Sequence, residues 1–246
     1  MAVVEKTIDL IGDDAFCDLI ISRKVAEGMP VDIYDEAIRK LRGSALRAMT
    51  GIQSLVLPNL TTCDGYALHE VKSLKRVSFP ACTYLGARVF QGCAALEEID
   101  MPKLGSMGEC EFTDCEALET VDLPSVTSTG SLAFYSCGKL KTVILPRLQT
   151  VGSSSFNGCP CIEQLDLPSV KSIQATAVAN ANALQVINIG PNITSIVSTA
   201  FQNTPDGLVI NLPVAEGVVA NAPWGAPNAI INYEVPYSGK VPMPES

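Results

Sequence analysis

The amino-acid sequence predicts an α/β fold dominated by a solenoid of short parallel β-strands, and three features of an internal repeat predict it. The chain repeats itself every 22 residues over most of its length of 246 residues. Each repeat contains a short run of alternating apolar residues that ends at a proline, as a brief strand does. Most repeats also carry a phenylalanine followed three residues later by a cysteine. Because a unit of this size cannot bury its own apolar face, neighbouring units must stack.

The repeat follows the pattern Leu-x-x-Val-x-Leu-Pro-x-Leu-x-x-Val-Gly-x-x-x-Phe-x-x-Cys-x-x. Six successive units align without a gap, and the seventh is longer by two residues, one before Pro191 and one before Leu208. So many aligned columns do not arise by chance. The units begin at Ile52, Leu74, Leu96, Leu118, Leu140, Ile162 and Leu184.

The first half of each unit forms the predicted strand. In the fourth unit Val121 and Leu123 alternate, so their side chains point to one face of the strand, and Thr120 and Asp122 point to the other. Pro124 has no backbone N–H to donate to a neighbouring strand, so the strand ends there. Repetition of this pattern predicts one stack of parallel strands.

The second half of each unit supplies three further columns. We expect the glycine to adopt a positive φ or to allow a close approach between backbones. We expect the aromatic ring to fill the wide end of each coil, with the cysteine as a small apolar filler beside it. The columns hold Phe90, Phe112, Phe134 and Phe156, then Cys93, Cys115, Cys137 and Cys159, and then Gly86, Gly108, Gly130 and Gly152.

The nine cysteines are predicted to be free thiols. Those of the column stack in one direction, which gives poor torsions for disulfides and cannot place four ligands around one tetrahedral zinc. Cys159-Pro-Cys161 is a single C-x-C pair without a second pair to complete a zinc site. We therefore expect no metal and no cofactor, and the unpaired thiols favour a reducing compartment. The remaining cysteines, which show no metal spacing, are Cys17, Cys63, Cys82 and Cys110.

The repeat resembles the BspA-like, or Treponema pallidum-type, leucine-rich repeat of bacterial surface proteins. Units of that family read Leu-x-x-Ile-x-Ile-Pro, then Val-x-x-Ile-Gly, then Ala-Phe-x-x-Cys, and the stretch from Leu118 to Gly138 matches them almost column by column. The resemblance covers residues 36–213 and implies a right-handed leucine-rich-repeat solenoid with little regular helix. It also implies adhesion or recognition at bacterial or phage surfaces. The first and sixth units depart from the family pattern, because they lack both the glycine and the cysteine.

Solenoid ends expose a cross-section of the core and need atypical caps. Apolar residues at helical spacing between Asp9 and Arg23 predict a helix in the N-terminal cap. Near the other end we expect a short helix from Glu216 to Ala222 and then a closing strand, with Trp224 as a lid on the apolar end. The expected domains are residues 1–35 as a small N-terminal helical cap, 36–213 as the solenoid, and 214–246 as a C-terminal cap and tail.

Composition and motifs argue against several classes of function. A net charge of −9 disfavours nucleic-acid binding, which needs a basic surface. His69 is the only histidine, and the chain has no Gly-x-Ser-x-Gly elbow, Walker loop or dinucleotide fingerprint, so we expect no enzyme. No apolar stretch approaches the roughly 18–20 residues of a membrane span, so we expect no membrane insertion.

Localisation stays open at this point. The N-terminus lacks the basic region and the apolar run of a secretory signal. The protein is therefore intracellular, leaves the cell by another route, or has lost its signal, and the resemblance favours a cell surface or a virion.

The outward side chains of the strands form the candidate binding surface. Glu98, Asp100 and Asp122 are expected to cluster there, and Asp166 extends the acidic character beyond Ile144. Such a face either keeps the surface polar and soluble or docks a basic or hydroxyl-rich partner. The candidate partner-binding residues are Arg76, Glu98, Asp100, Thr120, Asp122, Ile144 and Asp166.

These observations favour a non-enzymatic recognition or adhesion module that binds a protein or glycan on the strand face. The alternative is a structural or assembly component, for example of a phage tail or a surface particle, with no ligand site on that face. A hydrolase with a carboxylate pair on the strand face is a third hypothesis.

Overall fold

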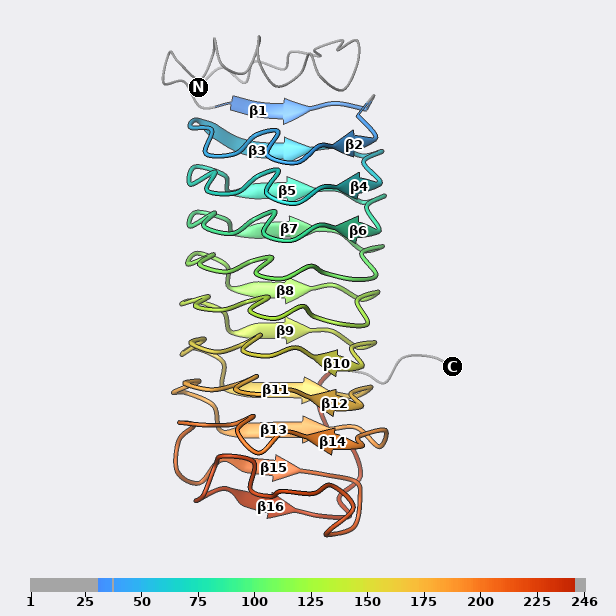
Figure 1. The fold of residues 1–246 in the computed structure, drawn as a ribbon, viewed down its shortest axis with the longest axis vertical. Coiled ribbons are helices and arrows are strands. Elements are labelled where there is room, and N and C mark those ends of the chain that lie inside the picture. Colours follow the sequence, from blue (N-terminus) through green and yellow to red (C-terminus); the bar gives the residue numbers. More distant parts are fainter. Residues whose placement is uncertain (1–30, 37, 242–246) are drawn as a thin grey trace.

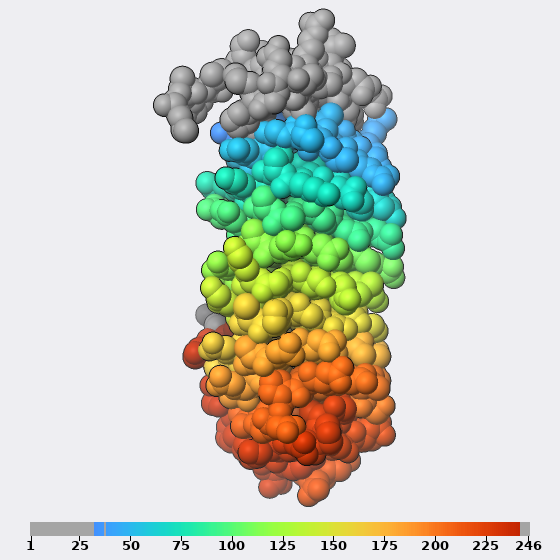
Figure 2. All heavy atoms as spheres, turned by 90° about the vertical axis from the view of Figure 1, so that its left-hand side faces the viewer, coloured from blue at the N-terminus to red at the C-terminus, as the bar shows by residue number. Residues whose placement is uncertain are grey.

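The computed structural model describes residues 31–36 and 38–241, and within these ranges the chain is a stack of coils (Figure 1). Each coil contributes one strand to a common row, in which Val77 of one strand pairs in parallel with Ile99 of the next. The coils form successive layers of an elongated molecule (Figure 2). The strands of this row are β1 (Val31–Tyr34), β3 (Ile52–Val56), β5 (Arg76–Ser78), β7 (Glu98–Asp100), β8 (Thr120–Asp122), β9 (Thr142–Ile144), β11 (Gln164–Leu167), β13 (Val186–Ile189), β15 (Val209–Asn211) and β16 (Ile230–Asn232).

The row consists of three hydrogen-bonded sheets that follow one another along the stack. Their strand orders are β1-β3-β5-β7, β8-β9 and β11-β13-β15-β16. Partners in most of the row are 22 residues apart, but Val186 of β13 pairs with Val209 of β15. The seventh unit is therefore longer by one residue, whereas the sequence analysis predicted two. Ser195 also pairs with Ser172, 23 residues earlier, so the extra residue lies between Ile189 and Ser195 and the later strands stay in register.

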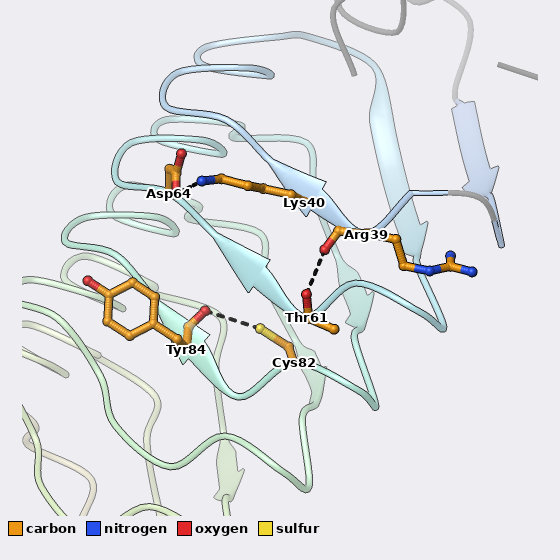
Figure 3. Close-up of polar contacts among 6 residues, drawn as sticks. All are labelled: Arg39, Lys40, Thr61, Asp64, Cys82 and Tyr84. Atoms are coloured by element: carbon orange, nitrogen blue, oxygen red, sulfur yellow. Dashed lines mark hydrogen bonds and ion pairs between the residues drawn. The ribbon is translucent and has the colours of Figure 1, made fainter. Parts of the chain in front are cut away.

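A second row of shorter strands runs along the stack just after the proline of each unit. Isolated bridges at Ser106 and Ser128 connect its two sheets, β2-β4-β6 and β10-β12-β14. At its N-terminal end, Thr61 Oγ1 donates to the carbonyl of Arg39, and Lys40 lies 3.1 Å from Asp64 Oδ1 (Figure 3). The strands are β2 (Lys40–Leu41), β4 (Thr62–Cys63), β6 (Tyr84–Leu85), β10 (Thr150–Val151), β12 (Ser172–Ile173) and β14 (Ser195–Ile196).

The described residues contain no helix, and the rest of each coil consists of turns. Two columns of residues in these turns have positive φ, four positions apart in the unit. These left-handed positions turn the chain sharply, which is how a coil returns to its strand without a helix. The first column holds Ser44, Tyr66, Arg88, Cys110, Leu132, Ser154 and Thr176, and the second Ala48, Glu70, Gly92, Asp114, Ser136, Gly158, Asn180 and Asn203.

The predicted aromatic column is present in the core. Phe90, Phe112, Phe134 and Phe156 are fully buried and stack with ring centroids 5.2, 5.4 and 5.3 Å apart. Adjacent rings are within 6° of parallel, because each occupies the same position in an identical coil. This stack confirms the parallel solenoid that the repeat predicts.

The cysteine column lies beside the rings and consists of buried free thiols, as predicted. Each thiol donates to a backbone carbonyl of the preceding coil: Cys137 Sγ lies 3.1 Å from the Phe112 oxygen, and Cys159 Sγ lies 3.1 Å from the Phe134 oxygen. The column therefore does more than fill space, since its thiols add a second hydrogen bond to carbonyl groups that already accept one from a backbone N–H.

Of the two roles expected for the glycine column, a positive φ or a close approach between backbones, the structure shows the second. A Cβ on Gly130 would lie 2.2 Å from the carbonyl oxygen of Gly108, and one on Gly152 would lie 2.5 Å from that of Gly130. None of the four predicted glycines has a positive φ. Successive coils therefore touch through their backbones at this corner, and any side chain there would force them apart.

The N-terminal end of the solenoid differs from its predicted boundary. Strand β1 pairs with β3, so the row already includes Val31, whereas the sequence analysis placed residues 1–35 in the cap. The alternation around Ile33 is too short to predict a strand from the sequence. The helix expected between Asp9 and Arg23 lies outside the described residues.

The C-terminal end combines one correct and one wrong prediction. Strand β16 provides the closing strand, but the expected helix from Glu216 to Ala222 is absent and turns take its place. Positive φ at Gly217 and Asn221 is incompatible with a helix through this segment. Trp224 is fully buried and packs edge-on against Phe201, with ring centroids 6.3 Å apart, so it closes the apolar end as expected.

Candidate binding surface

The strand face, which we define as the outward side chains of the long strand row, changes character along the stack. From β5 to β8 its side chains are exposed except that of Ser78, and at β9 Ile144 is half-buried. Farther along, the central polar side chains are buried in β11 and β13 and half-buried in β15 and β16. The seven candidate residues therefore do not form one uniform surface. Arg76, Glu98, Asp100, Thr120 and Asp122 are exposed, Ile144 is intermediate, and Asp166 is buried.

Parallel register places the exposed candidates side by side. Arg76 lies next to Glu98, and the Arg76 Nε atom is 3.4 Å from Glu98 Oε2. Both side chains are more than half exposed, so this ion pair adds little stability and leaves both groups accessible. Asp100 Oδ2 accepts a hydrogen bond of 2.6 Å from Ser78 Oγ in the preceding strand.

The expected acidic cluster lies on two neighbouring strands of the row. Glu98 and Asp100 are on β7, and Asp122 is on β8, where it is paired in register with Ile144 of β9. The exposed part of the strand face thus offers three carboxylates, one guanidinium and one threonine hydroxyl, followed by an aliphatic side chain. Such a surface accepts hydrogen bonds from basic or hydroxyl-bearing groups.

Asp166 differs from the other candidates, because only 5% of its surface is exposed and its carboxylate is used internally. Oδ1 accepts from Gln164 Nε2 at 2.9 Å and from Asn188 Nδ2 at 2.7 Å. Oδ2 accepts from the backbone N–H of Lys240 at 2.7 Å and from that of Val241 at 3.3 Å. The prediction that Asp166 extends the exposed acidic surface is therefore wrong.

Asp166 begins a ladder of side-chain amides that the sequence analysis did not identify. Asn188 donates to Asp166, Asn211 donates to Asn188 Oδ1 at 2.8 Å, and Asn232 donates to Asn211 Oδ1 at 2.8 Å. These residues occupy the same outward position in β11, β13, β15 and β16. The signal was in the sequence, since three asparagines stand at one position of successive units. We call this row the amide ladder.

The C-terminal segment 234–241, which we call the strap, runs back along the stack beside these strands (Figures 1 and 2). It leaves the last coil through hydrogen bonds from Glu234 N–H to the Val214 carbonyl and from Val235 N–H to the Leu212 carbonyl. It then reaches Asp166, and Tyr237 Oη donates to the Val241 carbonyl at 2.7 Å. Burial, and then the charge of Asp166, raise the pKa of Tyr237 well above its usual range, so its hydroxyl remains a donor.

A groove of about 650 Å³ lies between the strap and the strand face where β9 meets β11. Its lining includes Ile144 and Val186 of the strand row and Lys240 and Val241 of the strap. Lys141 lies on its rim and forms an ion pair with Glu119, with 3.1 Å between Nζ and Oε2. The groove therefore continues the exposed strand face toward the strap.

Other reactive side chains of the described residues lie apart from the strand face. His69 is half-buried, packs on Tyr66 with ring centroids 5.5 Å apart, and has its Nδ1 atom 3.7 Å from Glu70. Within residues 31–36 and 38–241, no three His, Cys, Asp or Glu side chains are arranged to hold a metal ion. In the same ranges no helix has the length and apolarity required to cross a bilayer.

One buried carboxyl, that of Glu111, escaped the sequence analysis. It stands immediately before Phe112, where other units have Ala67, Ala133 and Ala177, so the departure is visible in the aligned repeats. Burial raises the pKa of Glu111 well above its usual range, and the backbone of neighbouring residues offsets only part of this effect. Both carboxyl oxygens are buried without a hydrogen-bond partner, so burial favours the neutral form of this group.

Comparison with known proteins identifies the repeat. The BspA type leucine rich repeat region matches the chain in six copies, over residues 2–106 and 83–207. Among curated proteins no relative matches the chain.

Several solved structures are similar to the chain. A leucine-rich repeat protein of Bacteroides ovatus has a TM-score of 0.64 at 21% identity, and the match covers 76% of this chain and 53% of that protein. The Treponema pallidum leucine-rich repeat protein has a TM-score of 0.53 at 25% identity, with 65% of this chain and 74% of that protein covered. A leucine-rich cell surface protein of Faecalibacterium prausnitzii is similar at 19% identity, with a TM-score of 0.44 and coverage of 75% and 60%.

The chain spans about half the length of the Bacteroides ovatus protein, and the likeness lies in the solenoid itself. The matched repeats extend over most of the residues that form the stacked coils. Leucine-rich-repeat proteins of this kind are interaction or surface modules. From its repeats and from the fold that they build, this chain belongs to the BspA-type leucine-rich-repeat family.

Proposed function

We propose that the protein is a recognition module that binds a protein or glycan partner on the exposed part of its strand face. The observation that carries this proposal is the exposure of five polar candidate side chains on β5, β7 and β8, which are followed by Ile144 and the groove. The equivalent side chains after β9 are engaged by the amide ladder and the strap. A partner that docks on the strand face therefore finds exposed polar groups in its N-terminal part, from β5 to β8.

The chemistry of this surface favours a partner rich in amines, guanidinium groups or hydroxyls. The carboxylates of Glu98, Asp100 and Asp122 accept hydrogen bonds and attract cations, while Arg76 and Thr120 add donors. Extended solenoid faces present many such groups in fixed register, which suits adhesion to a repeating glycan or to a basic protein surface. Ile144 and the groove would accept an apolar group at the edge of this contact.

Assembly through the solenoid end is the second candidate function, and one observation favours it. Val218 and Ile230 at the last coil are 57% and 54% exposed, which is high for aliphatic side chains. An assembly component would use this end for contact and would leave the strand face as a soluble surface.

A triple substitution distinguishes the two candidates. We expect Glu98→Ser, Asp100→Ser and Asp122→Ser together to reduce binding to an array of glycans and Lys- or Arg-containing peptides at least tenfold. The matched control replaces three exposed carboxylates off the strand face by serine, at Glu109, Glu116 and Glu216, with the same change in net charge. Neither variant should shift the melting temperature appreciably, because all six side chains are exposed.

The recognition hypothesis fails if the wild-type chain binds no member of the array, or if the triple variant binds as well as the control. Loss of self-association or of binding in Val218→Ser/Ile230→Ser, with the triple variant unaffected, would support assembly instead.

A further inference from the structure

The strap is bound to the solenoid in the way that a separate peptide would be. Its residues Lys240 and Val241 follow Asp166 by 74 and 75 positions in the sequence, and their backbone N–H groups hold the strap at that residue. The Asp166 carboxylate accepts two consecutive backbone N–H groups, those of Lys240 and Val241. Such contacts recognise the course of a peptide backbone rather than one particular side chain.

Two further contacts define what this surface accepts. A Cβ on Gly239 would lie 2.7 Å from Asp166 Cγ and 2.4 Å from Tyr237 Oη, so a side chain at the position before the two N–H groups would have to displace Tyr237 or Asp166. Val241 is 6% exposed, so an aliphatic side chain is buried at the end of the segment. The bound sequence is therefore a glycine, one free position and an aliphatic residue.

Aspartate side chains at the same outward position are exposed where the strap is absent and buried beside it. Asp100 and Asp122 occupy the same outward position as Asp166 and are exposed, whereas Asp166 and Asn188 are 5% and 4% exposed. The amide ladder continues this polar row through Asn211 and Asn232, which are half-buried. A surface built of one carboxylate and three ordered amides is suited to hydrogen bonding with an extended backbone.

We propose that the strand face from β11 to β16 is a peptide-binding surface that the protein's own strap occupies in cis. The partner that fits it in trans is an extended segment with the chemistry of the strap, namely glycine, any residue and an aliphatic residue, with two free backbone N–H groups after the glycine. This surface is distinct from the exposed part of the strand face, and the proposal does not depend on the recognition function proposed above.

Covalent attachment gives the strap an advantage over any such partner. A tethered segment acts at an effective concentration on the order of millimolar, so a separate peptide competes poorly while the strap is in place. Displacing the strap should therefore reveal binding that the wild-type chain masks.

The test uses the full chain carrying Gly239→Val, together with a fluorescent peptide of sequence Glu-Val-Pro-Tyr-Ser-Gly-Lys-Val, which is that of the strap. We expect hydrogen exchange in residues 234–241 to accelerate, and we expect the peptide to bind this variant at least tenfold more tightly than it binds the wild-type chain. The same peptide with valine in place of glycine should not bind.

Matched variants separate the contributions. Ser238→Val places the same side chain on the neighbouring exposed residue and should behave like the wild-type chain. Lys240→Pro removes the donor of the 2.7 Å hydrogen bond and places the ring Cδ against Asp166 Oδ2 in its stead, so it should also release the strap and permit peptide binding. Adding Asp166→Ala to Gly239→Val should abolish the binding, because the acceptor is gone.

Three results would overturn the proposal. In the first, the strap exchanges freely in Gly239→Val and Lys240→Pro, yet the peptide binds neither. In the second, the strap stays protected in both variants, so Asp166 is not what holds it. In the third, the peptide binds the wild-type chain and the Asp166→Ala double variant equally well.

Discussion

At the scale of single residues, Glu111 is the departure from the repeat with the clearest consequence. A carboxyl replaces the small residues found at this position in other coils, and it is fully buried among thiols. Burial raises the pKa values of these thiols as well, to about 12 for Cys93 and about 11 for Cys82, so they stay protonated at neutral pH. Burial therefore disfavours the ionised forms of Glu111 and of these thiols.

The raised pKa of Glu111 makes stability depend on pH in a definite direction. Because the folded pKa lies above the unfolded value of 4.5, the stabilising effect is complete below pH 4.5 and is lost as pH rises through the folded pKa. We expect the free energy of unfolding to fall above pH 4.5 by up to about 1.4 kcal/mol per pH unit from this group. Urea unfolding between pH 5 and 8 measures the slope.

Glu111→Gln removes the ionisation and keeps the volume, so its slope should be flatter than that of the wild-type chain. Glu109→Gln, an exposed residue of the same coil, provides the control and should keep the wild-type slope. Equal slopes in all three proteins would show that Glu111 does not remain protonated in the folded state.

At the scale of the elements, the two left-handed columns determine how each coil turns. The second column contains Gly92 and Gly158, which adopt positive φ without strain, and between them Ser136, with a φ of 57°. A side chain at such a position costs roughly 1 kcal/mol relative to glycine. The turn geometry is therefore imposed on Ser136 by the stacking of neighbouring coils.

We expect Ser136→Gly to raise the free energy of unfolding by about 1 kcal/mol. Ser131→Gly, in the same coil but at an ordinary φ, should lower it by about 0.5–1 kcal/mol through the entropy of the unfolded chain. Thermal and urea unfolding of both variants test the pair. A loss of stability in Ser136→Gly would mean that its hydroxyl contributes more than the strained backbone costs.

The elements also show which predictions the sequence allowed. The alternation Val121-x-Leu123 before Pro124 recurs in each unit, so the strands and their common phase were predictable. The helix expected from Glu216 to Ala222 was wrong, because spacing alone does not reveal that Gly217 and Asn221 take left-handed conformations.

The candidate site was predictable only in part. The outward positions follow from alternation, which placed Glu98, Asp100 and Asp122 correctly on the exposed face. Asp166 satisfies the same alternation but is covered by the strap, a contact between residues 74 positions apart that no local pattern encodes. Periodicity predicts what a unit does, whereas contacts that break the periodicity need coordinates.

At the scale of the whole molecule, stability depends on contacts between neighbouring coils, so damage to one coil weakens both of its neighbours. Phe134 stacks on Phe112 and on Phe156 at once. We expect Phe134→Ala to lower the free energy of unfolding by about 3–5 kcal/mol, as buried aromatic truncations do. Urea unfolding followed by circular dichroism measures this change.

Tyr233→Ala is the control for this substitution, because Tyr233 is half-buried near the end of the stack and contacts the core from one side. Its effect should be clearly smaller. If the two substitutions cost the same, the aromatic column is not the main link between coils.

The strap also constrains how the molecule can change in length over evolution. In-frame duplication of a unit upstream of β11 lengthens the exposed face and leaves the distance from the last coil to Asp166 unchanged. Duplication between β11 and β16 moves Asp166 away from Lys240 by one rung, and a segment of fixed length no longer reaches its anchor. The C-terminal segment thus acts as a molecular ruler, which fixes the count of coils on one side of Asp166 and leaves the count on the other side free.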